Sequence, residues 1–259
     1  MTPSHALLLG AAAFGGGVMN SMAGGGTLLS FPALVFVGLP SIAANATSTF
    51  ALFPGAASSM AGYREEVRSH AHWLKTLFLP SLLGGALGAA LLLLTPERLF
   101  ARLAPFLVLF ATLLFLVQGW LARRRVRTGT APAVAEIPGR RLGIAVLAQL
   151  LIAVYGGYFG AGIGILMLAV LGFLGLEDIH AMNGLKNFFG LCINLVAAVT
   201  FALRGAVEWP LALLMIPCAM AGGYGGARFA RRIGRDKARA AVVVIGLAMS
   251  ALLFWQQAR

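Results

Sequence analysis

The chain has 259 residues, of which 59% are hydrophobic and only 11% are charged, and its mean hydropathy is +0.88. An average soluble domain carries about 25% charged residues, so a chain this apolar could not cover its surface with polar groups in water. The formal net charge of +12 does not indicate nucleic-acid binding, because the basic residues gather at the ends of apolar runs without interleaved aromatic residues to stack on bases. The composition therefore predicts an all-α integral membrane protein, with the lipid bilayer as its partner and no nucleic acid.

Ten apolar segments follow one another along the chain, and several reach the about 17–25 residues that a helix needs to cross a bilayer. They cover residues 6–22, 27–38, 42–62, 73–94, 104–122, 142–159, 163–175, 178–203, 209–230 and 239–255. No Lys or Arg precedes Leu7, so we expect no cleaved signal peptide. Cys192 and Cys218 both lie inside apolar segments, away from partners at metal-ligand spacing, and we therefore expect neither a disulfide framework nor a metal site.

The second half of the sequence resembles the first when it is shifted by 138 residues without gaps. The matched residues are clustered glycines and an asparagine inside an apolar run: Gly24, Gly26 and Asn45 fall on Gly162, Gly164 and Asn183, and the glycines at 84, 85 and 88 fall on those at 222, 223 and 226. Internal repeats are a common construction in secondary transporters. We predict a first transmembrane repeat at 1–122, a basic cytoplasmic linker at 123–141 and a second transmembrane repeat at 142–259.

Each half opens with an apolar stretch that glycines interrupt, at 24–26 and at 160–164. A glycine inside a helix costs about 1 kcal/mol relative to alanine, and broken backbone at membrane depth is tolerated only where it is buried or lines a wet cavity. The alternative is close helix packing through small residues, which is our interpretation of the glycines at 84–88. For the two openings we predict glycine-broken, re-entrant helix pairs, in which Thr27 and Ile165 begin the half-helices that follow the breaks.

Positive charge predicts the orientation of the chain in the membrane. Loops 63–75, 123–141 and 228–239 carry 3, 6 and 6 Lys or Arg residues. Four full crossings per half would put the two most basic loops on opposite sides, against the positive-inside rule. If each broken opening enters and returns on one side, each half makes three full crossings and the second half is inverted. We therefore predict two inverted repeats in the cell inner membrane, with all three basic loops in the cytoplasm.

The motifs at the two breaks resemble a known family. Residues 24–34 (Gly-Gly-Gly-Thr-Leu-Leu-Ser-Phe-Pro-Ala-Leu) and 44–49 (Ala-Asn-Ala-Thr-Ser-Thr), the glycine pattern at 160–164, the segment 183–187 and the closing segment 222–228 are similar to the TauE/SafE family of membrane anion exporters. The resemblance spans nearly the whole chain. It implies two duplicated modules and export of sulfite, sulfoacetate or related anions. One departure is that Ser48 stands in the first half where the second has Lys186, so the halves cannot contribute equally to anion binding.

An anion inside a membrane needs hydrogen-bond donors and positive potential, and the N-termini of half-helices supply both. We predict that the small anionic substrate binds the glycines of the breaks and the polar residues near them: Gly24, Gly25, Gly26, Thr27, Asn45, Thr47, Ser48, Gly160, Gly162, Gly164, Asn183, Lys186 and Asn187. Asn20, Tyr155 and Tyr158 are further candidates for the wall of the pocket.

Each of these residues also has a structural interpretation. Small polar residues can merely join helices, and a lysine in a span can extend its amine to the interface. A lysine inside a membrane helix costs at least about 2.5 kcal/mol on insertion scales, which favours a functional reading of Lys186 as the charge of the anion site.

The acidic residues argue against an intramembrane enzyme. All eight lie in loops or at the ends of the predicted spans, so no carboxylate pair falls within a span. Nucleotide-binding motifs are absent as well. We therefore predict no enzymatic activity and no cofactor, and a secondary transporter that works by alternating access. An anion channel and a membrane scaffold or accessory subunit are the alternatives, and a homodimer is a further hypothesis.

Overall fold

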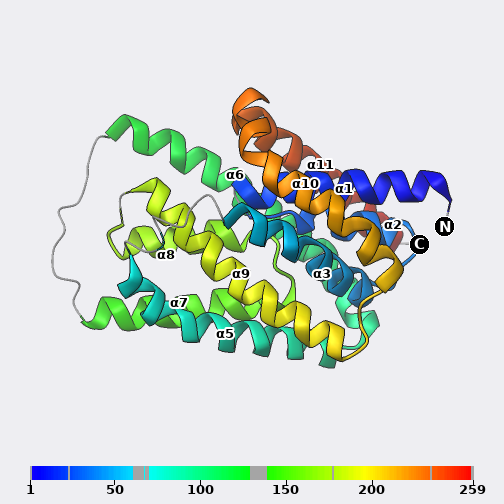
Figure 1. The fold of residues 1–259 in the computed structure, drawn as a ribbon, viewed down its shortest axis with the longest axis horizontal. Helices are drawn as coiled ribbons and strands as arrows, with labels where there is room; N and C mark the ends of the chain where they lie inside the picture. Colours follow the sequence, from blue (N-terminus) through cyan, green and yellow to red (C-terminus); the bar gives the residue numbers. More distant parts are fainter. Residues whose placement is uncertain are drawn as a thin grey trace.

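The computed structural model describes residues 2–22, 24–60, 67, 70–128, 139–176, 178–233 and 235–257. Within these ranges all regular secondary structure is helical, and most helices run along the long axis of the molecule (Figure 1). They are α1 (Pro3–Met22), α2 (Thr27–Phe36), α3 (Ser41–Met60), α5 (Ala71–Leu94), α6 (Glu97–Thr128), α7 (Gly139–Tyr158), α8 (Ile163–Phe173), α9 (Ile179–Leu203), α10 (Trp209–Ile233) and α11 (Arg235–Gln257). Each helix overlaps one of the ten predicted apolar segments. Of the predicted linker, 129–138 lie outside the described residues.

The two predicted breaks are confirmed as interruptions between a long helix and a short one. Gly24 in the first break and Gly160 and Gly162 in the second have φ values of 72°, 81° and 78°, a left-handed conformation that glycine adopts without steric cost. The second half-helix begins at Ile163, two residues before the predicted start at Ile165, because the left-handed Gly162 already ends the turn. With 10 and 11 residues, α2 and α8 are about 15 Å long, half the thickness of the hydrocarbon core.

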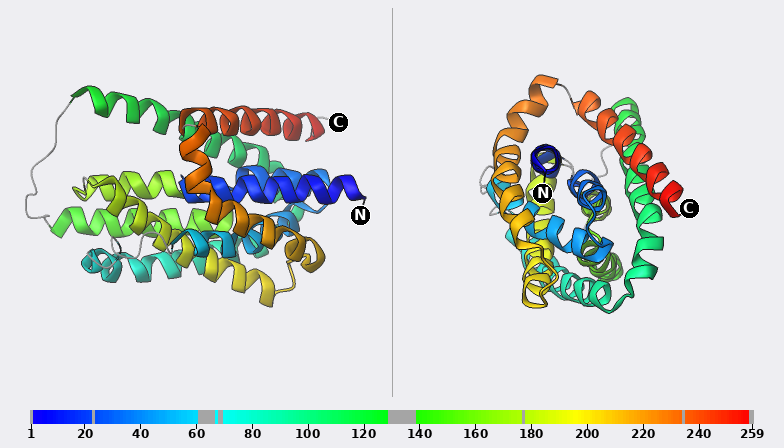
Figure 2. Two further views of the ribbon diagram at one scale, coloured as in Figure 1. Left: turned by 45° about the horizontal axis from the view of Figure 1, so that its top comes forward. Right: turned by 90° about the vertical axis from the view of Figure 1, so that its right-hand side faces the viewer.

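The chain reverses its direction at both breaks. Beyond the first break, α2 returns toward the end of the molecule where α1 begins, at the right of Figure 1. Beyond the second, α8 returns toward the end where α7 begins, at the left, and the left view of Figure 2 agrees. The two helix hairpins therefore enter the molecule from opposite ends of its long axis.

Helices from the two halves of the sequence pack against each other. Helix α10 lies along α1 and α3, whereas α5 lies along α7 and α9, and α6 pairs with α11. A Cβ built on Gly88 of α5 would lie 2.0 Å from the carbonyl oxygen of Val154 in α7. The α10–α1 contact is equally close, because a Cβ on Gly222 would lie 2.1 Å from the carbonyl oxygen of Phe14. The prediction that the glycines at 84–88 serve close helix packing is confirmed.

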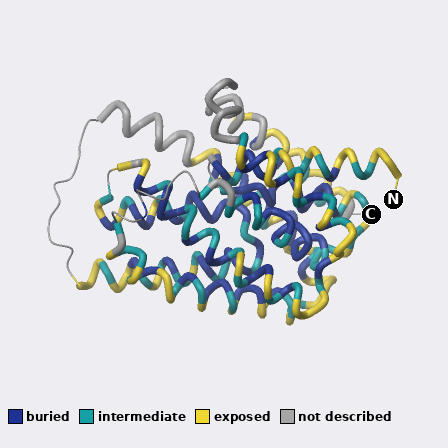
Figure 3. Tube along the Cα trace, in the orientation of Figure 1, coloured by how far each residue is buried: buried dark blue, intermediate teal, exposed yellow. Residues whose placement is uncertain are grey.

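Apolar side chains cover the outside of the bundle, and Figure 3 shows the exposed positions along its outer helices. On α5, Leu79, Leu83, Leu87 and Leu91 are each about half exposed or more, and their four-residue spacing puts them on one face. Polar residues such as Asn45 are instead fully buried. Within the part of the chain that the structure describes, four helical stretches are long and apolar enough to cross a membrane: His72–Leu94, Glu97–Val117, Gly139–Tyr158 and His180–Leu203. The chain is a multi-pass membrane protein.

Candidate functional site

The two breaks meet in the interior of the bundle. A Cβ built on Gly24 would lie 3.2 Å from the Cα atom of Gly164, and one built on Gly160 would lie 4.0 Å from Oγ1 of Thr27. The N-termini of α2 and α8 are therefore neighbours. Because helix N-termini present unpaired N–H groups and the positive end of the helix dipole, this junction has the electrostatic character of an anion site.

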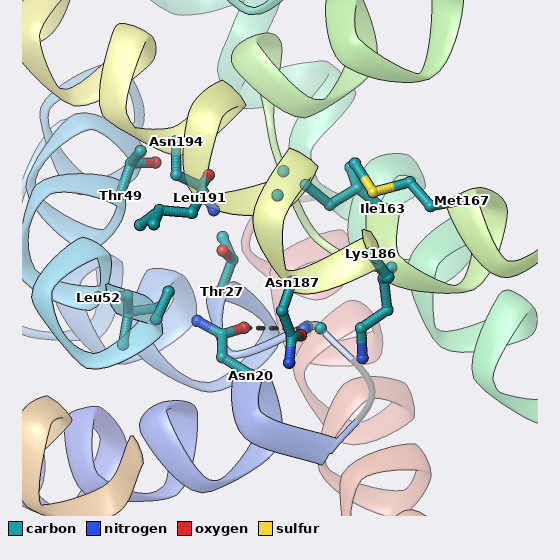
Figure 4. A pocket seen from close by; sticks show the side chains of 16 residues that line it. Asn20, Thr27, Thr49, Leu52, Ile163, Met167, Lys186, Asn187, Leu191 and Asn194 are labelled. Carbon is teal, nitrogen blue, oxygen red and sulfur yellow. Dashed lines mark hydrogen bonds between the residues drawn. The ribbon is translucent and has the colours of Figure 1, made fainter. Parts of the chain in front are cut away.

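A cavity of about 40 Å³ lies at this junction. One water needs about 10–15 Å³ of such space, so the cavity has room for a few waters or a small anion. The breaks, α3 and α9 form its wall, and Figure 4 shows the side chains around it. Seven of the predicted substrate-binding residues line the cavity: Gly24, Gly25, Thr27, Gly160, Gly164, Lys186 and Asn187.

Lys186 brings a positive charge to this wall. Its side chain is 2% exposed, and its Nζ atom donates a hydrogen bond to Oδ1 of Asn183, one turn earlier on α9, at 3.2 Å. Asn183 is not among the cavity-lining residues. The amide oxygen of Asn183 thus orients the lysine within the protein interior, while the lysine itself borders the cavity.

Asn187 brings an unused hydrogen-bond donor to the cavity. Among the side-chain atoms of the described residues, its Nδ2 atom and Oδ1 of Asn45 are buried without a hydrogen-bond partner. A buried polar group left unsatisfied costs about 1–3 kcal/mol. An acceptor atom inside the cavity would remove that cost for Asn187, which makes this amide suited to hold an oxyanion.

Two side chains support the backbone of the breaks. Oδ1 of Asn20 accepts a hydrogen bond from the backbone N–H group of Gly25 at 3.0 Å (Figure 4, dashed line) and another from that of Gly26 at 2.8 Å. Asn20 also lines the cavity, as expected for a secondary candidate. At the second break, the hydroxyl of Tyr155 donates to the carbonyl oxygen of Ala161 at 2.7 Å. Tyr155 therefore stabilises the turn, and it is not among the cavity-lining residues.

The predicted polar residues of α3 lie away from the cavity and join helices. Nδ2 of Asn45 donates to the carbonyl oxygen of Tyr158 at the end of α7, at 3.0 Å. Oγ1 of Thr47 accepts from the N–H of Glu208, next to the start of α10, at 3.0 Å. The Ser48 hydroxyl forms a hydrogen bond with that of Ser30 on α2.

The remaining two predicted glycines, Gly26 and Gly162, also lie outside the cavity wall. A Cβ on Gly26 would lie 2.3 Å from the carbonyl oxygen of Gly16 in α1. Gly162 faces α6, where the nearest backbone atom to such a Cβ is Cα of Ala111 at 3.6 Å. Both glycines thus position the breaks without bordering the cavity.

Sequence reasoning missed several wall residues on α3 and α9. The missed residues are Thr49, Leu52 and Ala56 on α3 and Gly190 and Asn194 on α9. Together with the predicted Asn187, the residues of α9 occupy positions 138 residues after those of α3. Spacings of three and four residues place each set on one helix face. Extending the predicted face of α9 from Asn187 by the helical period would have found Gly190 and Asn194, and the repeat would then have found their partners on α3.

Comparison with known proteins assigns a family. Residues 9–253 match the family model described as sulfite exporter TauE/SafE. The chain is similar to a "probable membrane transporter protein" of Haemophilus influenzae, with 27% identity over 92% of this chain and 90% of the relative. A relative from a Sinorhizobium species, "probable membrane transporter protein ORF9", is 27% identical over 92% of this chain and 88% of its own length. "Probable membrane transporter protein YfcA" of Escherichia coli is also 27% identical, over 92% and 86%. No solved structure gives a significant match.

Proposed function

Because the chain belongs to the TauE/SafE sulfite exporter family, we propose that it is a secondary transporter that exports a small anion of the sulfite, sulfonate or carboxylate class. Membrane transport as such is what the family and the names of the relatives indicate. The observation that carries the finer proposal is the position of Lys186, a lysine buried in a membrane helix and bordering a cavity. A cation placed there at the cost of its hydration is best explained by an anionic partner.

The wall chemistry fits an oxyanion. Lys186 supplies charge, Asn187 supplies a free amide N–H, and the α8 N-terminus supplies backbone donors and a positive dipole. Within the described part of the chain no acidic side chain lines the cavity. A hydrogen bond to a charged group contributes about 1.5–3 kcal/mol, enough to select an anion without holding it irreversibly.

The proposal includes an alternating-access mechanism built on inverted repeats. Two features support repeats at 1–122 and 142–259 that are related by a pseudo-two-fold axis. The helix hairpins enter from opposite ends of the molecule, and α1 packs on α10 as α7 packs on α5. In transporters of this construction, one unit rocks against the other around a site near the bilayer midplane. The cavity between the breaks would then open to each side in turn.

The proposed orientation places the basic loops in the cytoplasm and the protein in the inner membrane. It can be tested with single cysteines at Thr128 and Arg235, in a protein whose Cys192 and Cys218 are replaced by alanine. Because the positive-inside rule retains both basic regions on one side, we expect both cysteines to react with an impermeant maleimide only from the cytoplasmic side. Labelling from opposite sides would contradict the inverted arrangement.

Flux measurements test the function itself. The purified protein is reconstituted into liposomes, and uptake of sulfite, sulfoacetate and acetate is followed with and without an imposed proton gradient. We expect saturable flux of at least one anion and its loss in the Lys186→Gln variant, with protein-free liposomes as the blank. A non-saturating conductance would favour a channel, and the absence of flux with every anion would contradict the proposal.

A further inference from the structure

The two half-helix N-termini at the cavity differ in one respect. At α2, the side-chain oxygen of Asn20 accepts hydrogen bonds from two consecutive backbone N–H groups, those of Gly25 and Gly26. At α8, Ile163 and Gly164 border the cavity, and none of the side-chain hydrogen bonds found among the described residues reaches their backbone N–H groups. One N-terminus is thus occupied by a side chain of the protein, and the other faces the cavity.

The oxygen of Asn20 lies where an anion would lie. Consecutive N–H groups at a helix start are the usual binding position for a phosphate, sulfate or carboxylate oxygen. The amide oxygen carries a partial negative charge and meets these donors at 3.0 and 2.8 Å, as a bound oxyanion would. Asn20 also lines the cavity, so its side chain separates those donors from the space beside Lys186.

We propose that Asn20 determines specificity: its side-chain oxygen occupies the anion position at the N-terminus of α2, and this leaves one oxyanion position, at α8 beside Lys186 and Asn187. The inference rests on the anion-transport function proposed above. It narrows the substrate to anions with one charged group, such as hydrogensulfite, a simple sulfonate or a monocarboxylate. A second negative charge would find neither free donors at α2 nor a second cation among the described residues of the wall, and an uncompensated charge is costly in a low-dielectric site.

The variant Asn20→Asp separates this role from a merely structural one. A carboxylate accepts the same two N–H groups and is favourable at a helix N-terminus, so the fold is retained. The added charge, however, makes residue 20 a tethered anion beside Lys186. We expect the affinity of the purified full-length protein for methanesulfonate and acetate, measured by calorimetry, to fall tenfold or more while the melting temperature stays at the wild-type value.

The variant Asn20→Ala tests the converse. It frees the Gly25 and Gly26 donors, and we expect the affinity for sulfoacetate and malonate, which carry two charged groups, to rise at least fivefold relative to methanesulfonate and acetate. Thr47→Val is the matched control, because it also removes a buried hydrogen bond but lies outside the cavity wall. In this variant, the affinity for sulfoacetate and malonate relative to that for methanesulfonate and acetate should stay within twofold of the wild-type ratio.

The outcomes separate the two proposals. If the wild-type protein binds none of the four anions, the transport proposal fails, and this inference fails with it. If the wild type binds an anion and Asn20→Asp binds it equally well with an unchanged melting temperature, Asn20 is only a structural cap and this inference alone is overturned. Should Asn20→Ala fail to fold, the Asn20→Asp result still decides.

Discussion

Helices α3 and α9 hold matching places in the two halves of the sequence and face the same cavity, but they bring different chemistry to it. The matching wall positions are Thr49, Leu52 and Ala56 on α3 and Asn187, Gly190 and Asn194 on α9. On α3, two of the three side chains are aliphatic and one is a hydroxyl. On α9, two amides flank a glycine that leaves space between them. The polar side of the cavity is therefore the α9 side.

Lys186 on α9 and Ser48 at the matching position of α3 show the same contrast. Lys186 borders the cavity, whereas Ser48, at the matching position of α3, is fully buried and bonded to Ser30. The other polar residues of α3, Asn45 and Thr47, bond to backbone groups at the ends of α7 and α10. On α3, Asn45, Thr47 and Ser48 thus hold helices together, whereas on α9 Lys186 and Asn187 line the cavity. A matching position in a repeat predicts where a residue lies but not what it does there.

The largest difference between the halves should appear at the breaks themselves. Gly26 has a helical φ of −55°, but a Cβ there would lie 2.3 Å from the Gly16 carbonyl oxygen. At Gly162 the situation is reversed. Its φ of 78° is left-handed, but a Cβ built there would lie no closer than 3.5 Å to the surrounding atoms, which is an ordinary van der Waals contact. We expect Gly26→Ala to abolish folded protein, because backbone would have to move. Gly162→Ala should cost only about 1–2 kcal/mol.

Size-exclusion profiles and melting temperatures of the two detergent-solubilised alanine variants measure this difference. If Gly26→Ala gave a normal elution profile while Gly162→Ala gave no folded protein, the breaks would require glycine because of backbone strain and not because of close packing.

A smaller effect is expected when polarity is removed from the cavity wall. Asn187→Leu removes a buried donor that has no partner in the protein, so the melting temperature should be kept or raised while anion affinity falls about tenfold. Thr49→Val, the matching change on α3, should lower affinity less than threefold. Calorimetric titration and thermal melting measure both. Equal losses in the two variants would mean that the halves contribute alike.

The smallest effect concerns a helix-joining residue of the first half. Thr47→Val removes the acceptor for the Glu208 N–H and should lower the free energy of unfolding by about 1 kcal/mol. Anion affinity should not change, because Thr47 lies outside the cavity wall. If affinity instead fell while the melting temperature held, Thr47 would belong to the binding site, as its sequence context predicts.

Much of the fold could be predicted because its causes are local. Helix positions follow from apolar segment length, and the breaks follow from clustered glycines, since left-handed backbone at Gly24 and Gly160 requires that residue type. The start of α8 was misplaced by two residues because the conformation of Gly162 depends on the turn and not on its neighbours in sequence.

The site could be predicted only in part, because hydrogen bonds between distant segments decide which polar residues face the cavity. Asn45 bonds to a carbonyl group 113 residues away, and Thr47 bonds to an N–H group 161 residues away. Neither partner is marked by a local pattern. Lys186 and Asn187 were found because a charge beside an amide inside an apolar helix is unusual wherever the helix packs.

The central claim, that the anion is held by the charge of the second half, is tested most directly by titrating Lys186→Gln with sulfite, sulfoacetate and acetate. Removing a charge-assisted hydrogen bond worth about 1.5–3 kcal/mol predicts a ten- to hundredfold loss of affinity. Lys186→Arg should lose less, because it keeps the charge, and Ser48→Ala at the matching position should bind as the wild type does. Wild-type affinity of Lys186→Gln for every anion would contradict the account.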